Sequence, residues 1–204
     1  MRIDRHTETI KKRYERISSI YDLSEFVIPK SWRKKLLQGV QGKVLEVGVG
    51  TGANLIYYPA EAEVFGIDFS PKMLRKAFRK AEEAEANIAL GVMDVQDLGF
   101  PDNTFDFVVS SLVFCTVPDP VRGLKEISRV VKRDGKIIML EHMRSENEMV
   151  GKLLDFMNPV TLTLMGENIN RRTMDDIAEA GLVVEKEENL CSSLVRKLVL
   201  RPGK

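Results

Sequence analysis

Three glycines at alternate positions follow an acidic residue in the stretch Glu46-Val-Gly48-Val-Gly50-Thr51-Gly52. A short apolar run precedes the stretch, which predicts a strand that ends in a tight turn. Glycine permits such a turn and lets a ligand come close to the backbone, because it has no Cβ. Asp68 ends another apolar run twenty residues after Gly48, where a carboxylate can hold the hydroxyls of a ribose. The pattern therefore predicts a pocket for a nucleoside.

The glycine pattern alone leaves the nucleoside open, because it also satisfies the fingerprint of dinucleotide-binding proteins. Glu46 would repel a dinucleotide phosphate, whereas it suits a ligand that carries an ammonium group. Another acidic site, Asp94-Val95, follows a third apolar run. About 150 residues follow the glycines, which suffices to finish one domain but not to add the substrate domain of many dehydrogenases. A nicotinamide-dependent oxidoreductase is therefore the disfavoured alternative.

Five segments of the chain resemble the class I S-adenosylmethionine-dependent methyltransferases and run in the order of that family. They are Glu46-Val-Gly48-Val-Gly50-Thr-Gly52, Gly66-Ile-Asp68-Phe-Ser70-Pro71-Lys-Met73-Leu74, Asp94-Val-Gln-Asp97-Leu-Gly-Phe100-Pro101, Phe105-Asp106-Phe-Val-Val-Ser110-Ser111 and Arg129-Val-Val-Lys132-Arg-Asp-Gly135-Lys136. The similarity covers roughly residues 10–202. It implies an enzyme that transfers a methyl group from S-adenosylmethionine, and it is much less specific for the methyl acceptor.

The same resemblance implies which residues hold the cofactor. Glu46 and the loop from Gly48 to Gly52 would lie beside its methionine part, and Asp68 on its ribose hydroxyls. Asp94 and Val95 would lie at the adenine, with Asp97 as a substitute for Asp94. Ser110 or Leu112 would lie near the sulfonium, although Ser110 could equally end a strand. The implied cofactor-binding residues are Glu46, Gly48, Gly50, Thr51, Gly52, Asp68, Phe69, Met73, Asp94, Val95, Ser110 and Leu112.

The composition bounds the class of protein. Lys and Arg number 31 against 30 Asp and Glu, so there is no general attraction to nucleic acid and we expect no such partner. Two cysteines and two histidines are too few for a disulfide framework or a zinc site, and we expect no metal. No apolar run approaches transmembrane length, and the N-terminus lacks a signal-peptide core. We therefore expect a cytoplasmic protein, whose oligomeric state stays open.

Apolar runs alternate with helical patterns, which predicts an α/β fold with a parallel sheet covered by helices on both faces. The order resembles the seven-stranded, mostly parallel, Rossmann-like sheet of the methyltransferases. Two final strands with no helix between them predict an antiparallel hairpin at the sheet edge. We expect one methyltransferase domain over residues 1–204, with a helical cap over 1–40 and an inserted apolar lid segment over 143–170. The expected strands are 43–47, 62–68, 87–92, 105–110, 136–141, 182–190 and 194–201.

Capping residues predict several helix boundaries. Ser70-Pro71 predicts the N-cap and first residue of one helix. Thr173-Met-Asp-Asp176 predicts a capping box that opens another helix, which Gly181 stops. Further helices are expected over 4–20, 31–38, 51–58 (ended by Pro59) and 119–132 (closed by Asp134-Gly135).

Three residues are candidates for the acceptor side of the site, namely Tyr14, Tyr21 and His142. His142 follows the fifth strand, where carboxyl ends of strands face the substrate, so it could accept a proton or bind an anionic group. A hydrogen-bonded histidine at a strand end is the alternative. Tyr14 and Tyr21 could form rigid amphipathic walls at the pocket mouth.

Two other motifs have a functional and a structural interpretation. Cys115 lies in an apolar run, so we expect a small buried side chain rather than a nucleophile. Arg171-Arg172 predicts either a phosphate site or a solvated basic pair.

Two segments indicate a lipid-like acceptor. The helix expected over 4–20 has a basic face that suits an anionic membrane surface, and packing over the cofactor is the alternative. Residues 143–168 are rich in methionine and predict either a lid that contacts lipid or a packed helix pair. The segment Arg13-Tyr14 to Tyr21-Asp22 resembles quinone C-methyltransferases and bacterial phospholipid N-methyltransferases. The stretches 110–142 and 168–180 look closer to the phospholipid group.

The resemblance favours methyl transfer to the amine of an aminophospholipid such as phosphatidylethanolamine, with peripheral attachment to the inner membrane face. C-methylation of a menaquinol- or ubiquinol-type precursor, and methylation of a small-molecule thiol or amine, are alternatives. A cofactor-binding membrane module without catalysis also stays open. Transfer to an amine needs alignment more than a base, whereas transfer to a quinol carbon asks for a base, for which His142 is the candidate.

Overall fold

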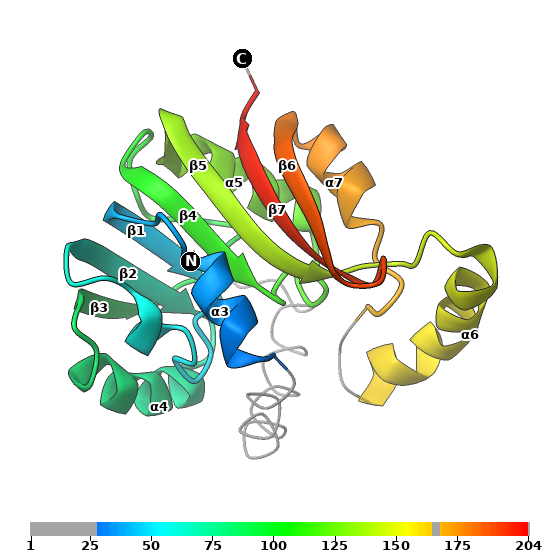
Figure 1. The fold of residues 1–204 in the computed structure, drawn as a ribbon, viewed down its shortest axis with the longest axis horizontal. Coiled ribbons are helices and arrows are strands. Elements are labelled where there is room, and N and C mark those ends of the chain that lie inside the picture. Colours follow the sequence, from blue (N-terminus) through cyan, green and yellow to red (C-terminus); the bar gives the residue numbers. More distant parts are fainter. Residues whose placement is uncertain (1–27, 165–167, 204) are drawn as a thin grey trace.

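The computed structural model describes residues 28–164 and 168–203, and its centre is a seven-stranded sheet (Figure 1). The strands lie in the order β3-β2-β1-β4-β5-β7-β6. The first five are parallel, and β7 runs antiparallel between β5 and β6. This confirms the predicted fold class and the C-terminal hairpin. The strands are β1 (Gly42–Val47), β2 (Ala62–Asp68), β3 (Asn87–Val92), β4 (Phe105–Ser111), β5 (Val131–His142), β6 (Leu182–Cys191) and β7 (Val195–Pro202).

The central strands are apolar on both faces because helices cover both. On one face, α3 (Lys30–Leu36), the short 3-10 turn η1 (Leu55–Tyr57) and α4 (Pro71–Glu82) pack against the sheet. On the other face lie α5 (Pro120–Val130) and α7 (Thr173–Glu179). Alternate residues of each strand therefore point into two separate cores, and this alternation decides the face on which each site residue lies.

Helix α6 (Glu148–Leu164) stands apart from both layers, beside the edge of the sheet that ends in β6 (Figure 1). It forms most of the predicted segment 143–168 as one helix, with Pro159 inside it. Within the described residues, no helix is long and apolar enough to span a membrane. The expected helix over 4–20, together with Tyr14 and Tyr21, lies outside the described residues.

Two helix predictions were wrong in extent. Residues 51–58 form only the 3-10 turn η1, because the loop before it is held by glycines with positive φ. Helix α5 ends at Val130, and Gly135 does not close it but lies within β5. A Cβ on Gly135 would come within 2.7 Å of the Asp106 carbonyl oxygen, so this glycine permits close contact between strands.

The capping predictions had mixed outcomes. The Ser70 hydroxyl accepts a hydrogen bond from the Met73 N–H at the start of α4, as predicted. The capping box at Thr173 was wrong, because Thr173 is the first helical residue and its buried hydroxyl has no hydrogen-bond partner. Gly181 follows α7 with a φ of +74°, which is the expected conformation of a residue that ends a helix.

Candidate cofactor site

The three glycines of the loop after β1 differ in what surrounds them. Gly48 has a φ of +64°, and a Cβ there would lie 2.4 Å from a methyl group of Val113. Gly52 has a φ of +81°, and a Cβ there would lie 3.0 Å from the Ala77 backbone in α4. Gly50 has a φ of +57°, yet a Cβ there would meet nothing closer than 3.9 Å. The backbone at Gly50 is therefore the part of the loop that leaves room for a ligand.

Asp68 at the end of β2 joins this loop to α4. One carboxylate oxygen accepts from the Gly50 N–H at 3.0 Å and the other from the Ser70 N–H at 2.8 Å. Burial raises the pKa of Asp68 to about 6, and the two N–H donors limit the rise. Each oxygen keeps a lone pair, because a carboxylate accepts about four hydrogen bonds. The residue can therefore order the loop and still accept the hydroxyls of a ribose.

Glu46 at the end of β1 is buried on the α3 face of the sheet. Arg33 of α3 donates to the side-chain oxygen of Asn54 at 2.7 Å, and the Asn54 amide donates to Glu46 at 2.8 Å. The buried Tyr58 hydroxyl lies beside Glu46, but no hydrogen bond of ordinary geometry reaches the second carboxylate oxygen. Burial raises the pKa of Glu46 to about 7, which the Asn54 hydrogen bond, the nearby Tyr58 hydroxyl and the Arg33 charge partly oppose. An unsatisfied buried oxygen beside the loop fits a ligand that brings an ammonium donor.

The residues predicted at the adenine lie just after β3. The Met93 N–H donates to the Asp68 carbonyl at 3.2 Å, which brings Asp94 close to the end of β2. The Asp94 carboxylate accepts from both the backbone and the side-chain amide of Gln96. Val95 is buried and packs in the core, and its contact with the adenine stays a prediction. Asp97, the predicted substitute for Asp94, is exposed.

Sequence reasoning did not assign a role to Glu141, which lies fully buried at the end of β5. One of its oxygens accepts from the Ser110 hydroxyl at 2.8 Å and from the N–H groups of Val113 and Phe114 at 3.3 and 3.5 Å. Its other oxygen has no hydrogen-bond partner. Burial raises the pKa of Glu141 to about 7. The available signal was an acidic residue that ends a long apolar run, as Glu46 does.

The Glu141 carboxylate holds a turn that lies against the glycine loop. Leu112 in this turn has a φ of +55°, a left-handed conformation that disfavours any side chain. Val113, the next residue, is the one that a Cβ on Gly48 would strike. Ser110 is therefore a strand-end residue that also positions the turn, whereas its predicted contact with the sulfonium stays a prediction.

His142 follows Glu141 and so lies on the opposite face of β5. It is half-buried, and burial lowers its pKa. Its imidazole makes no hydrogen bond within the described residues, and its role as a base stays a prediction. A neutral imidazole with a free ring nitrogen can accept a proton.

The remaining predicted residues divide between core and surface. Thr51 and Met73 are buried, and Phe69 is half-buried. Cys115 is buried, as predicted for a small core residue. Arg171 turns inward to donate to the Val117 carbonyl at 2.9 Å, while Arg172 is exposed beside Asp175. The structure thus places the two arginines in different surroundings, and a phosphate site there stays a prediction.

Comparison with known proteins agrees with this geometry. A family model described as a methyltransferase domain matches residues 45–139. A phosphatidylethanolamine N-methyltransferase of Cereibacter sphaeroides is 39% identical over 140 residues, which cover 66% of this chain and 68% of that protein. A ubiquinone/menaquinone biosynthesis C-methyltransferase of Bdellovibrio bacteriovorus is 32% identical over 170 residues, which cover 78% and 72%.

A solved structure gives the same fold. The crystal structure of an S-adenosylmethionine-dependent methyltransferase from Aquifex aeolicus matches with a TM-score of 0.61 at 20% identity, covering 82% of this chain and 88% of that chain. The glycine loop, Asp68 and the unsatisfied oxygen of Glu46 fit the nucleoside and the ammonium group of S-adenosylmethionine. Within the described residues, no group of three or more His, Cys, Asp or Glu side chains could hold a metal ion. The chain belongs to the S-adenosylmethionine-dependent methyltransferases, and S-adenosylmethionine is its cofactor.

Proposed function

We propose that this enzyme methylates the amine of an aminophospholipid such as phosphatidylethanolamine. The observation that carries the proposal is the exposed apolar face of α6. Met149, Leu153, Phe156 and Val160 are 80%, 56%, 82% and 59% exposed. Their spacing of four, three and four residues puts them on one side of the helix. An exposed apolar stripe of this kind is typical of a surface that contacts lipid or another apolar partner.

The inner side of α6 is polar, which is the reverse of an ordinary surface helix. Arg144 donates two hydrogen bonds from Nε and one from Nη2 to Asp155, at 2.9 to 3.2 Å. Asn170 donates to the same carboxylate at 2.9 Å, and Asn158 bonds Asn168 at 2.7 Å. The helix is therefore held by polar contacts, while Met149, Leu153, Phe156 and Val160 stay exposed. This arrangement supports an occupant with acyl chains.

The position of α6 in the chain also supports a lipid acceptor. The helix follows β5, whose carboxyl end carries Glu141 and His142, and it precedes Arg171. The proposed location is the cytoplasm, with peripheral attachment to the inner membrane face.

The name of the Cereibacter sphaeroides relative agrees with an aminophospholipid acceptor. Tyr14 and Tyr21 stay proposed as walls of the acceptor pocket.

For this reaction the protein must mainly align the acceptor amine with the methyl group of the cofactor. When bound, S-adenosylmethionine supplies a methyl group that its positive sulfonium already activates for in-line displacement. Asp68 and the glycine loop orient the ligand, and Glu141 holds the turn from Leu112 to Phe114 at the edge of the pocket. An amine that arrives neutral attacks with its own lone pair, so no strong base is needed.

A second candidate is C-methylation of a quinol, and His142 is the observation that favours it. Its lowered pKa suits a base, as do ring nitrogens that make no hydrogen bond to the part of the chain that the structure describes. Attack by a quinol carbon would use such a base. The name of the Bdellovibrio bacteriovorus relative agrees with this chemistry. Methylation of a small-molecule thiol or amine is a third candidate.

The deciding experiment offers purified enzyme isotope-labelled S-adenosylmethionine with each acceptor in neutral detergent micelles. The acceptors are phosphatidylethanolamine and a demethylated menaquinol. We expect mass spectrometry to find methylated phosphatidylethanolamine. Turnover of the quinol alone would replace our first proposal by the second. Binding of the cofactor without turnover of any acceptor would favour a module without catalysis.

A further inference from the structure

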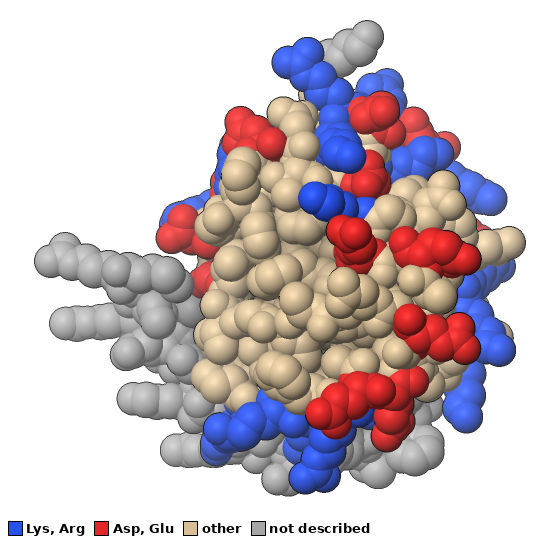
Figure 2. Space-filling model, turned by 90° about the vertical axis from the view of Figure 1, so that its left-hand side faces the viewer, with Lys and Arg blue, Asp and Glu red and all other residues tan. Residues whose placement is uncertain are grey.

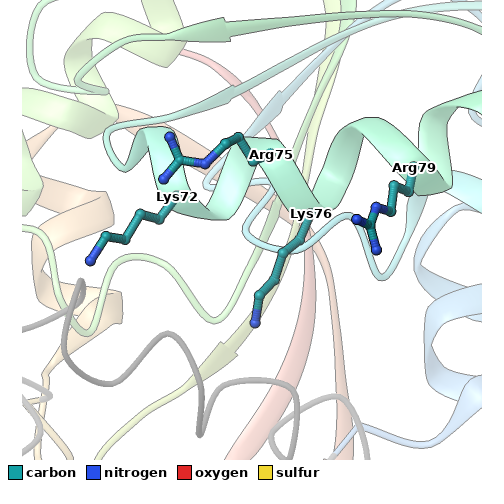
Figure 3. A pocket seen from close by; sticks show the side chains of 4 residues that line it. All are labelled: Lys72, Arg75, Lys76 and Arg79. Carbon is teal, nitrogen blue, oxygen red and sulfur yellow. The ribbon is translucent and has the colours of Figure 1, made fainter.

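Helix α4 carries five basic residues, four of which are Lys72, Arg75, Lys76 and Arg79. Their spacing of three, one and three residues puts them on one side of the helix. The opposite side is buried in the core through Met73, Leu74 and Ala77. The four basic side chains line a single hollow on the surface, and Figure 3 shows them projecting from successive turns of α4.

The basic stripe (Lys72, Arg75, Lys76 and Arg79) stabilises α4 only at its C-terminal end, where Arg79 lies in the last turn. Cations are unfavourable near the N-terminus of a helix, and α4 has no acidic residue in its first turn. Lys72, Arg75 and Arg79 are exposed, and none of these three forms an ion pair in the part of the chain that the structure describes. Within the described residues, Lys72, Arg75 and Arg79 are therefore available to an anionic partner.

The stripe begins close to the cofactor site. Lys72 comes four residues after Asp68 and two after the Ser70 cap, at the carboxyl edge of the sheet. Figure 2 shows the side of the molecule on which α4 lies, where Lys and Arg gather at the lower border, beside a group of Asp and Glu and below a largely uncharged centre. Phe78, on the same helix, is 55% exposed. Positive charge beside an exposed aromatic ring is typical of a surface that meets lipid headgroups.

We infer that the basic stripe of α4 docks on the anionic surface of a lipid bilayer. Charge complementarity identifies the partner, because the stripe presents cations where a bilayer presents a sheet of phosphates. A bilayer in this position would lie at the edge of the sheet where the cofactor is held, and this part of the inference rests on the proposed lipid acceptor. The chain has a net charge of only +1, so the attraction comes from this local stripe and not from the whole molecule.

The test measures sedimentation of the full chain with vesicles of phosphatidylglycerol and phosphatidylcholine at low salt. The variant Lys72→Gln/Arg75→Gln/Arg79→Gln removes three charges without adding a poor helix former. Each basic residue near an anionic surface changes partitioning about fivefold, so we expect the triple variant to bind about 100-fold more weakly. Wild-type binding should also fall with added salt and be absent with pure phosphatidylcholine.

A matched control removes three exposed charges from the other face of the sheet. Arg122→Gln/Lys125→Gln/Arg133→Gln changes the net charge equally, and we expect it to bind anionic vesicles within about twofold of wild type. Equal loss of binding in both variants would overturn the inference, as would unchanged binding of the α4 variant. The inference would also be overturned if wild-type protein did not bind anionic vesicles. Tighter binding of duplex DNA than of vesicles through the stripe, at equal phosphate concentration, would overturn it as well.

A second measurement separates this inference from the proposed function. Turnover of phosphatidylethanolamine in neutral micelles does not involve the basic stripe, so we expect the α4 variant to match wild type there and to lose activity on anionic vesicles. If wild type methylates no phosphatidylethanolamine yet needs the stripe for vesicle binding, the proposed function fails and the docking surface stands. If it methylates the lipid and the variant binds vesicles normally, the docking surface fails.

Discussion

Two buried carboxylates, Glu46 and Glu141, lie at the carboxyl ends of β1 and β5 on opposite faces of the sheet. In each, one oxygen is held by hydrogen bonds and the other accepts none of ordinary geometry. Burying a carboxylate without full hydrogen bonding is unfavourable, which raises the pKa of both residues to about 7. Both side chains lie where a bound ligand could donate hydrogen bonds to them, and this is the pattern expected around a cofactor site.

Asp68 should dominate recognition of the ribose. We expect Asp68→Ala to weaken binding of S-adenosylmethionine by about 1.5–3 kcal/mol, because it removes charge-assisted hydrogen bonds and the anchor of Gly50. Titration calorimetry with S-adenosylhomocysteine measures this change. Asp97→Ala is the matched control, since Asp97 is exposed, and its affinity should equal that of wild type. Unchanged affinity in Asp68→Ala, or tight binding of NAD, would contradict the role given to Asp68.

His142 should distinguish the two candidate acceptors. If the acceptor is an amine, alignment dominates and His142→Ala should lower turnover only a few-fold. If the acceptor is a quinol carbon, loss of a positioned base should lower turnover by roughly 10²–10⁴-fold. Initial rates with phosphatidylethanolamine and with a demethylated menaquinol measure both cases. A near-complete loss of amine methylation in His142→Ala would show that the amine reaction needs more than alignment.

At the scale of elements, the loop after β1 must fit against α4. Gly52 and Gly39 both have a φ of +81°, but a Cβ on Gly52 would touch Ala77 while one on Gly39 would touch nothing. We expect Gly39→Ala to lower the free energy of unfolding by about 1–2 kcal/mol through backbone strain alone. Gly52→Ala should lower it by about 1–3 kcal/mol more, because the loop and α4 must separate. Urea unfolding measures both; equal losses would mean that the loop is not packed as described.

The exposed apolar side chains of α6 should contribute to binding of the acceptor rather than to the stability of the fold. We expect Met149→Gln/Leu153→Gln/Phe156→Gln to raise KM for vesicle-borne phosphatidylethanolamine at least tenfold, because exposed apolar area that meets lipid is lost. Its affinity for S-adenosylhomocysteine and its Tm should stay as in wild type. The control Ile56→Gln/Val183→Gln also removes exposed apolar side chains, away from α6, and should leave KM unchanged. A fall in Tm of the α6 variant would indicate instead that the stripe packs against the protein.

For the whole molecule, buried acids set the pH dependence of stability. The pKa values of Glu46 and Glu141 rise to about 7 and that of Asp68 to about 6 on folding. Between about pH 4.5 and 7 the folded chain therefore holds protons that the unfolded chain has released. Hence the stability that these groups contribute is present at the acidic end and is lost as the pH rises. We expect the free energy of unfolding to decrease from pH 5 to pH 7.5.

The variant Glu141→Gln tests this linkage. Glutamine keeps the size and one acceptor of the side chain but does not ionise, so the slope between pH 5 and 7.5 should flatten by about 2–3 kcal/mol in total. Chemical unfolding at several pH values measures the slope. Glu126→Gln is the control, because Arg129 lowers the pKa of Glu126, which therefore does not titrate in this range. An unchanged slope in Glu141→Gln would show that Glu141 is ionised throughout.

The sequence by itself determined the order of strands and helices, the glycine turn, Asp68 at the end of β2 and the Ser70 cap. These features depend on hydrophobic alternation, on backbone freedom at glycine and on capping hydrogen bonds, all of which act between residues close in the chain. The same local rules failed at Thr173 and at Gly135. Burial of the hydroxyl decided the first, and close approach of a neighbouring strand decided the second.

Only the tertiary structure decided which distant side chains meet. Strand order puts β4 between β1 and β5, so that Ser110 reaches Glu141 and the turn after β4 reaches Gly48. Packing of α3 on the sheet brings Arg33 to Asn54 and so to Glu46. Polar contacts with Asp155 turn the apolar side of α6 outward. Each of these contacts depends on the register between strands and on which face of an element is buried. A residue pattern within one element determines neither the register nor the buried face.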